Sequence, residues 1–398
     1  MQESAFSHGF GLGGVVPIYC LYLSVFFRAT ADMLLYAYLP LCLYYSLGET
    51  RLWVIGLFMG IPSFVRLLVA PLWGKWTDRL GRQRVFIVTG LLAYGLLLLV
   101  LPRYTDPLAI TAFTSLMAVL FAAFNPVSRV WLSLSCPREE IHRLANWHQW
   151  EAAGYLVSSV VAGWSVNEGY LALTELLTLL GILLLGSACL VSLTLRDIPA
   201  RSPLRRIEYI QSPSLSSHRR ALGMAGIFPL TTLLYFLASS TTWEAVATNF
   251  GLYFTGFLGG SVRLYGLLIG TSTFVSILAY GSLAGFCERH GYRKTLQMAA
   301  WGYTFMYLLM SYPSVRIAGC AYLLPMSTVV RSAMNVLVTS QVPERKRGEA
   351  MGLVESVEAC STAWGAVLGG LVAHQQGLDC IPRLAVAGSI LLHMLVAR

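Results

Sequence analysis

Charged side chains interrupt several of the longest apolar stretches of this 398-residue chain. A charge at the centre of a membrane-spanning helix costs roughly 2.5–3.5 kcal/mol, so an embedded charge is a functional candidate by default. Arg28 and Asp32 are four residues apart and would share one face of a helix. The principal embedded charges are Arg28, Asp32, Arg129, Glu151, Glu244, Arg331, Glu355 and Glu358, with Arg66 in the second span as a further one. Side chains of these types can form ion pairs, bind ions or exchange protons.

Two interpretations of these charges remain open. In the first they are structural ion pairs, and the expected pairs are Arg28 with Asp32, Arg129 with Glu151, and Arg331 with Glu358. In the second, a partly desolvated carboxylate favours its protonated form and can take up and release a proton. Asp32, Glu151 and Glu244 are the candidates for that role. For Arg129 and Arg331, a bracing ion pair is favoured over direct binding of an anion.

The composition is that of a membrane protein. Hydrophobic residues make up 56% of the chain, charged residues only 12%, and the mean hydropathy is +0.64, whereas soluble domains contain about 25% charged residues. Since a bilayer span needs about 20 mostly apolar residues, the sequence predicts twelve spans. Inside lipid these must be helices, because each backbone polar group has to be bonded within its own segment. They are 16–46, 52–73, 85–102, 107–135, 144–166, 170–194, 222–257, 262–284, 295–312, 315–341, 349–373 and 381–397.

Basic residues gather in every second connection between these spans. The connections after even-numbered spans contain clusters of basic residues, for example at 75–84, 196–220 and 345–347. The connections after odd-numbered spans contain only isolated arginines. This bias predicts that both termini are cytoplasmic, in the cell (inner) membrane. It also accounts for the net charge of +9, so no nucleic-acid partner is expected. Residues 1–14 contain no Lys or Arg and therefore lack the basic start of a signal peptide.

Motifs for enzymatic chemistry are missing or out of context. Gly9, Gly11 and Gly14 fit G-x-G-x-x-G, but no strand precedes them, as dinucleotide binding requires. The chain has no phosphate-binding G-x-x-x-x-G-K-[ST] motif, and its seven histidines do not have metal-binding spacing. Its eight cysteines are scattered and form no C-x-x-C pair. We therefore expect no enzyme, no metal site and no cofactor.

An internal repeat divides the chain into two halves. Residues 56–84 align without a gap to residues 266–294, and Gly56, Gly60 and Phe64 have identical partners 210 positions later. Such duplication predicts two homologous bundles around a shared centre. The Pro-, Ser- and Arg-rich segment 196–221 would be a cytoplasmic connector on anionic headgroups or a solvated linker. The expected domains are 1–195, the connector 196–221, and 222–398.

The turn after the second span carries a recognisable motif, Gly74-Lys-Trp-Thr-Asp78-Arg79-Leu-Gly81-Arg82-Gln-Arg84, with a degenerate copy at 284–294. A glycine lets one helix approach another closely, and a second glycine permits a tight turn. The motif closely resembles the G-x-x-x-D-R-x-G-R-[RK]-[RK] loop signature of the major facilitator superfamily. The resemblance implies a latch that holds the two halves together when the cytoplasmic side is closed. The implied gate residues are Gly74, Asp78, Arg79, Gly81, Arg82, Glu288, Arg289 and Gly291.

The resemblance covers nearly the whole chain and implies its architecture. The implied fold is an all-α membrane protein, with twelve transmembrane helices in two pseudo-symmetric six-helix bundles. In this superfamily the first, fourth, seventh and tenth helices line a central cavity. The charges that would then converge there are Asp32, Arg129, Glu244 and Arg331.

The branch of the superfamily is less well marked. The segment 365–370, GAVLGG, resembles part of a motif of drug:proton antiporters, but the span 144–166 lacks the proline of that motif. Asn125-Pro126 leading into Leu144-Ala145-Asn146 is similar to the macrolide-efflux and lysophospholipid-transporter branches. The resemblance is therefore to an efflux-type transporter of either kind.

The expected function is alternating-access secondary transport of small organic molecules. The leading hypothesis is proton-coupled export of amphipathic compounds by a monomer, with protons, a small-molecule substrate and the lipid bilayer as partners. One alternative is a narrower solute, either an organic anion or a lysophospholipid-like molecule. A non-transporting membrane receptor is a further alternative, although such a receptor has no use for a gate.

Overall fold

The described part of the chain is helical apart from short turns. The computed structural model describes residues 12–80, 82–135, 140–165, 170–197, 230–341 and 347–396, and no strand occurs among them. Eight helical stretches within these ranges are long and apolar enough to cross a membrane. The remaining predicted spans also form helices, of 17 to 26 residues. The predicted all-α membrane fold is confirmed.

Contacts along the chain define two units. The first joins Met1–Leu47 to Leu68–Pro199, and the second joins Gly48–Leu67 to Ala200–Arg398. Helix α3 (Leu52–Leu80) therefore contributes its first half to the second unit and its second half to the first. The predicted connector 196–221 falls almost entirely outside the described residues. Its role as the boundary between domains 1–195 and 222–398 stays a prediction.

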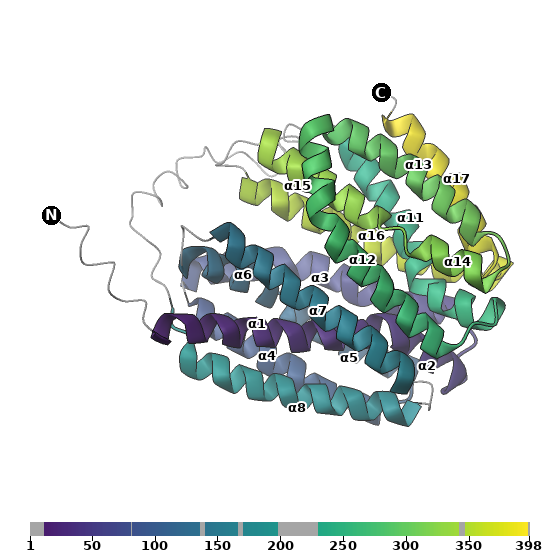
Figure 1. Cartoon of the computed structure of the whole chain (residues 1–398). Helices are drawn as coiled ribbons and strands as arrows, with labels where there is room; N and C mark the ends of the chain where they lie inside the picture. The colour runs from purple at the N-terminus through teal and green to yellow at the C-terminus, as the bar shows by residue number, and fades with distance from the viewer. Residues whose placement is uncertain are drawn as a thin grey trace. The chain divides into compact units, whose positions relative to one another are not determined.

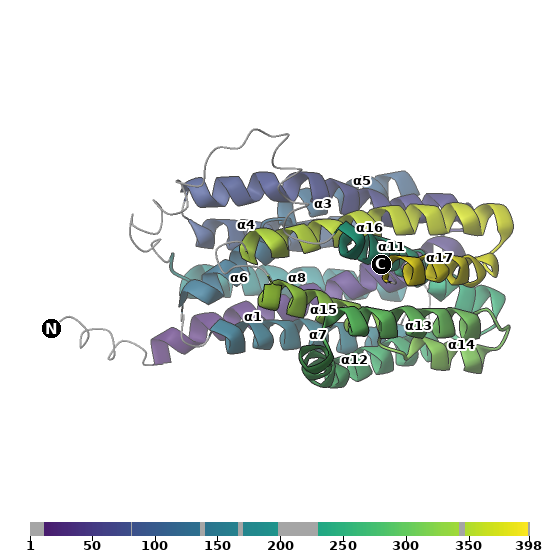
Figure 2. The ribbon, with the colours of Figure 1, turned by 90° about the horizontal axis from the view of Figure 1, so that it is seen from above.

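The first unit is built around helix α1. In Figures 1 and 2, α1 lies beside α7, and it packs against α8 as well. Helix α4 packs between α8 and α5. The elements are α1 (Leu12–Met33), η1 (Leu34–Tyr38), α2 (Leu39–Tyr45), α4 (Gln83–Val100), η2 (Leu101–Arg103), α5 (Pro107–Phe121), α6 (Phe124–Ser135), α7 (Glu140–Ser165) and α8 (Tyr170–Thr194).

The second unit has a similar plan centred on helix α11. This helix packs against α16 and α17, while α13 packs against α15 and α17 (Figure 2). The elements are α11 (Leu230–Leu252), η5 (Tyr253–Phe257), α12 (Val262–His290), α13 (Tyr292–Met310), α14 (Val315–Tyr322), α15 (Met326–Gln341), α16 (Arg347–Gln376) and α17 (Cys380–Val396).

The helices differ from the predicted spans in three ways. The span 107–135 breaks at residues 122–123, and Pro126 lies in the first turn of α6, where a proline is tolerated. The span 315–341 breaks before Met326, directly after Pro325. Helices α3 and α12 run on to Leu80 and His290, beyond the predicted ends at 73 and 284. A helix can continue beyond the bilayer with charged residues. The drop in hydrophobicity after residues 73 and 284 therefore marks the end of each predicted span and not the end of the helix.

Two π-helical turns occupy corresponding places in the two units. Residues 34–38 prolong α1, and residues 253–257 prolong α11. A glycine with positive φ comes two residues after the second turn, Gly259 at 74°, while Gly48 at 71° follows helix α2, which separates it from the first turn; glycine adopts this conformation without strain. Turns of this kind are frequent at functional sites in helices. The hydrophobic pattern contained no sign of them.

Helix α3 is held at its two ends by different neighbours. In its first half, an added Cβ at Gly56 would lie 2.7 Å from the Ala366 carbonyl oxygen, and one at Gly60 would lie 2.7 Å from that of Ala363, both on α16. In its second half, the Trp73 indole donates a hydrogen bond to the Val119 carbonyl on α5 at 2.7 Å. Small residues thus let α3 and α16 pack backbone to backbone, as in many membrane helix pairs.

The same type of contact joins α1 to α7 at Gly154. An added Cβ there would lie 2.5 Å from the Phe26 carbonyl oxygen and 2.9 Å from the Ala29 Cβ, so neither neighbour could turn away. Polar contacts follow the interface: Ser158 donates to the Thr30 carbonyl at 2.8 Å, and Tyr38 to the Ser159 carbonyl at 2.6 Å. Helix α7 is therefore held in close register with α1.

We predict that Gly154→Ala destabilises the protein, because the methyl group has no space and α7 must move away from α1. The expected loss is about 1–3 kcal/mol, the usual effect of overpacking. Thermal unfolding of the detergent-solubilised protein would measure it. Gly186→Ala on α8 is the matched control, since an added Cβ there meets nothing within 4 Å. Equal melting temperatures for the two variants would contradict the predicted packing.

Candidate functional site

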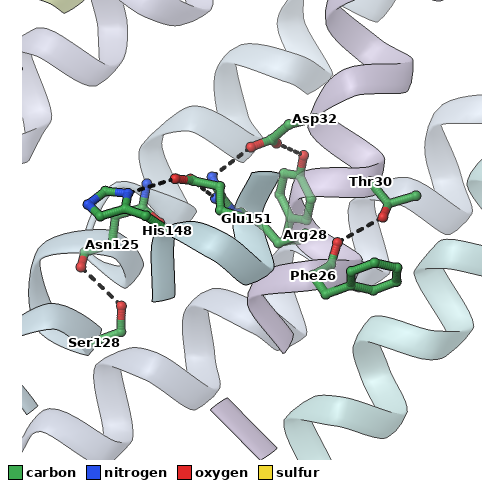
Figure 3. Close-up of polar contacts among 9 residues, drawn as sticks. Phe26, Arg28, Thr30, Asp32, Asn125, Ser128, His148 and Glu151 are labelled. Atoms are coloured by element: carbon green, nitrogen blue, oxygen red, sulfur yellow. Dashed lines mark hydrogen bonds and ion pairs between the residues drawn. The ribbon is translucent and has the colours of Figure 1, made fainter. Parts of the chain in front are cut away.

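A buried guanidinium lies at the centre of the first unit. Arg28 on α1 has a side chain only 4% exposed, and its Nη1 lies 2.8 Å from Asp32 Oδ2 one helical turn later. Its Nη2 donates to Glu151 Oε1 on α7 (Figure 3). One cation is thus shared between two carboxylates from two helices. Their side chains are 33% exposed for Asp32 and 16% exposed for Glu151.

Two further polar side chains extend this network. The Tyr94 hydroxyl on α4 donates to the other oxygen of Asp32, Oδ1. The His148 ring Nδ1 lies 3.3 Å from the other oxygen of Glu151, Oε2 (Figure 3). Four interactions therefore connect five side chains in the order His148, Glu151, Arg28, Asp32, Tyr94. We call these five residues the Arg28 network.

The local sequence explains how these groups meet. Arg28 and Asp32 are at i and i+4 on α1, and His148 and Glu151 are at i and i+3 on α7, so each pair shares a helix face. Gly154 follows Glu151 by three residues and allows α7 to approach α1 closely. The small residue thereby brings the Glu151 carboxylate within reach of Arg28.

A second arginine lies close to the network. The Arg129 guanidinium on α6 is 4.6 Å from the centroid of the Trp147 ring, and that of Arg28 is 5.8 Å from the same centroid. Trp147 itself is fully buried on α7. An indole ring in contact with two guanidinium groups stabilises both through cation–π attraction, so Trp147 forms an aromatic contact between the Arg28 network and α6.

Two of the three ion pairs expected from the sequence are present among the residues that the structure describes. The pairs Arg28–Asp32 and Arg331–Glu358 are both present. The described partners of Glu151 are Arg28 and His148, however, and not the expected Arg129. The difference arises because the close packing at Gly154 directs Glu151 towards α1 rather than towards α6.

In the second unit, Glu244 lies on α11 against α16. Its Cβ would be 2.6 Å from a Cβ added at Gly365. The glycine at 365 therefore lets α16 approach α11 closely at Glu244. The side chain of Glu355 lies outside the described residues.

The gate motif is described only in part. Gly74, Asp78 and Arg79 lie in the last two turns of α3 and not in a loop, and their side chains are outside the described set, as is Gly81. Arg82 is exposed at the start of α4. In the second copy, Arg289 is exposed and Gly291 ends α12 with a φ of 83°, while the Glu288 side chain is not described. The latch stays a prediction, and so does the convergence of Asp32, Arg129, Glu244 and Arg331 on one cavity.

Sequence reasoning missed two members of the Arg28 network. His148 has a local signal, because it precedes the candidate Glu151 by three residues and therefore shares its helix face. Tyr94 has none, since its contact with Asp32 depends on how α4 packs within the unit. Among the described residues no group of three or more His, Cys, Asp or Glu side chains could hold a metal ion.

We predict that Arg28→Gln lowers stability by about 3–5 kcal/mol, because it leaves Asp32 and Glu151 without their cation in a buried site. The double variant Arg28→Gln, Glu151→Gln should recover part of that loss, because it removes one of the stranded charges. Thermal unfolding of the single and double variants completes the cycle. Purely additive effects would show that Arg28 and Glu151 do not interact.

Comparisons with known proteins agree on the type of protein. The profile of the MFS_1-like family matches residues 21–381. No curated protein sequence matches the chain significantly. The similar solved structures are under 25% identical to this chain, so these likenesses support the fold alone.

Three solved structures illustrate the likeness. A point mutant of the nucleoside transporter NupG has a TM-score of 0.76 at 14% identity, covering 96% of this chain and 99% of that one. A bacterial homologue of the human lysosomal transporter Spinster, inward-facing and unoccupied, also scores 0.76, at 13% identity with 98% and 97% covered. The human organic anion transporter MFSD10 scores 0.68 at 15% identity, with 96% and 99% covered.

The match to the family profile extends over most of the chain, and the solved relatives are membrane transporters rather than enzymes. Together with the helical membrane fold, this identifies the protein as a secondary transporter for small molecules. The chain belongs to the MFS_1-like family of the major facilitator superfamily.

Proposed function

We propose that the protein exports amphipathic organic compounds in exchange for protons, and that the Arg28 network couples the two movements. The observation that carries this proposal is the sharing of one buried guanidinium between Asp32 and Glu151. Proton-coupled export is also the leading hypothesis from the sequence, and the carboxylates of Asp32 and Glu151 are the groups that would carry the proton.

The charge balance of the network suits proton exchange. Arg28 brings one positive charge, and Asp32 and Glu151 bring two negative charges when both are ionised, so one carboxylate is in excess while His148 is neutral. A proton on either carboxylate leaves a neutral ion pair between Arg28 and the other. Embedding an uncompensated charge costs roughly 2.5–3.5 kcal/mol, so the network gains when it binds a proton or an organic cation. Competition between these two ligands is the basis of the proposed coupling.

Asp32 is the carboxylate of the network that a substrate can reach most easily. A third of its side chain is exposed, whereas Arg28 is almost fully buried. Its two oxygens are held by Arg28 and Tyr94, both of which donate to the charged form. Protonation of Asp32 would release both donors and would free Arg28 to pair with Glu151 alone. A proton at Asp32 can thereby change the contacts between α1, α4 and α7.

Transport of an anion is the second candidate. The Arg129 guanidinium over Trp147 is a cationic and aromatic group, and the structure of MFSD10, described as a human organic anion transporter, has the same fold. In the second unit, however, Arg331 pairs with Glu358, which neutralises its charge. The excess carboxylate of the Arg28 network favours a cationic substrate.

The remaining expectations belong to the same proposal. The distribution of basic residues supports cytoplasmic termini in the cell (inner) membrane. The motif at 74–84 and its copy at 284–294 would latch the cytoplasmic side in one state of the cycle, and one chain would suffice for transport, because both halves of the repeat are present in it.

Uptake of radiolabelled tetraphenylphosphonium into proteoliposomes with an acidic interior tests the function. We predict proton-driven accumulation by the wild type. Asp32→Asn and Glu151→Gln should each lose it, because either change removes the excess carboxylate for which the proton and the cation compete. Tetraphenylborate, an anion of the same shape, should not be transported.

Asp379→Asn provides the matched control. Asp379 pairs with Arg383 at 3.1 Å with the same i, i+4 spacing as Asp32 and Arg28, but at the start of α17 in the second unit. This variant should accumulate the cation like the wild type. Accumulation that persists in both Asp32→Asn and Glu151→Gln would overturn the proposed coupling site. Transport of tetraphenylborate alone would favour the anion alternative.

A further inference from the structure

His148 is the exposed end of the Arg28 network. Its side chain is 55% exposed, compared with 16% for Glu151 and 4% for Arg28. The ring Nδ1 contacts Glu151 Oε2, while the other carboxylate oxygen, Oε1, is bound by Arg28 (Figure 3). Glu151 is therefore held from one side by a buried cation and from the other by a solvent-exposed imidazole.

The two partners of Glu151 differ in the chemistry they can perform. A guanidinium has no acceptor and keeps its proton in proteins, so protons cannot pass from Glu151 to Asp32 through Arg28. An imidazole has a donor and an acceptor nitrogen, and it normally changes charge between roughly pH 5 and pH 8. Within the network, only His148 can carry a proton between water and Glu151.

Charged groups on three helices lie near His148. The imidazole lies edge-on against the Trp147 ring, with 5.0 Å between centroids. The guanidinium groups of Arg28 from α1 and Arg129 from α6 lie over that same indole. Glu151 on the same helix is the acidic group in direct contact with His148, and Asp32 and Tyr94 lie beyond Arg28 in the network.

Buried polar atoms beside the network indicate internal water. Arg28 Nε, Trp147 Nε1 and Asn125 Oδ1 have no hydrogen-bond partner within the described part of the chain. Buried polar groups are almost always bonded to protein or to ordered water. These two donors and one acceptor, on α1, α7 and α6, are available to bind ordered water.

We propose that His148 is the residue through which Glu151 exchanges protons with water, an assignment that rests on the proposed proton-coupled function. Water protonates Nε2 while Nδ1–H donates to Glu151 Oε2. The Nδ1 proton then moves to Glu151, which leaves a neutral imidazole protonated at Nε2. Glu151, now neutral, releases Arg28 to pair with Asp32 alone. The reverse sequence returns the proton to water, so the exchange is balanced and needs no other reactant.

The variant that tests this role is His148→Gln, because the amide can hydrogen-bond to Glu151 but cannot titrate. We expect the rate of proton-driven tetraphenylphosphonium uptake to fall about tenfold. This loss is smaller than the factor of about 10²–10⁴ that a positioned acid or base usually contributes, because water can still reach Glu151 directly. The remaining activity should lose its dependence on pH between roughly 5 and 8, where imidazoles titrate. The affinity for tetraphenylphosphonium, measured by equilibrium dialysis, should not change.

His374→Gln is the control, since His374 is also exposed, in the last turn of α16, and lies outside both the Arg28 network and the gate motif with its copy. Its pH profile should equal that of the wild type. A second variant, His148→Ala, should regain uptake when imidazole is added, because the exposed position admits a free imidazole. Rescue by imidazole, but not by pyrazole, which has the same size and is hardly protonated near neutral pH, identifies proton transfer and not packing as the missing function.

The outcomes separate this inference from the proposed function. If His148→Gln keeps the wild-type rate and pH profile while Glu151→Gln abolishes coupling, His148 has no role and the coupling site stands. Failure of imidazole to restore His148→Ala, with its tetraphenylphosphonium affinity intact, would also overturn the assignment. If Asp32→Asn and Glu151→Gln both stay coupled, the proposed function itself fails.

Discussion

The requirement that most shapes the first unit is the neutralisation of Arg28. A guanidinium keeps its charge under all ordinary conditions, and here it is almost fully buried in a helix that crosses the membrane. Such a charge is tolerated only where carboxylates compensate it and its donors are bonded. Asp32 from its own helix and Glu151 from α7 meet this need together. The contact between α1 and α7 is thus electrostatic as well as steric.

The glycine at 154 connects packing to electrostatics. Because it has no side chain, α7 lies close enough to α1 for Glu151 to reach Arg28. In the second unit Gly365 lies in the same way against α11, next to Glu244. Both units therefore place a carboxylate beside a glycine where two helices cross closely, and both prolong the central helix with a π-helical turn. The internal repeat of the sequence is visible in this common plan.

The sequence could predict what depends on neighbours along the chain. The apolar stretch 170–194 has the same bounds as α8, because its hydrophobicity ends where the helix ends. The Arg28–Asp32 pair follows from its spacing of four. The link from Arg28 to Glu151 could not be predicted, since it depends on the register of α1 against α7, and the sequence suggested Arg129 instead. The helical path of Gly74–Arg79 was missed because only hydrophobicity, and not helix continuity, defined the predicted end of that span.

Proton release on substrate binding is the measurement that tests the central claim most directly. Tetraphenylphosphonium would be added to the detergent-solubilised protein in weakly buffered solution, and the pH followed with an indicator dye. If the cation and the proton compete for the excess carboxylate of the Arg28 network, binding must release protons from the wild type. The double variant Asp32→Asn, Glu151→Gln must release none. Equal proton release by the two proteins would contradict the account, as would cation binding without any release across the pH range in which the wild type transports.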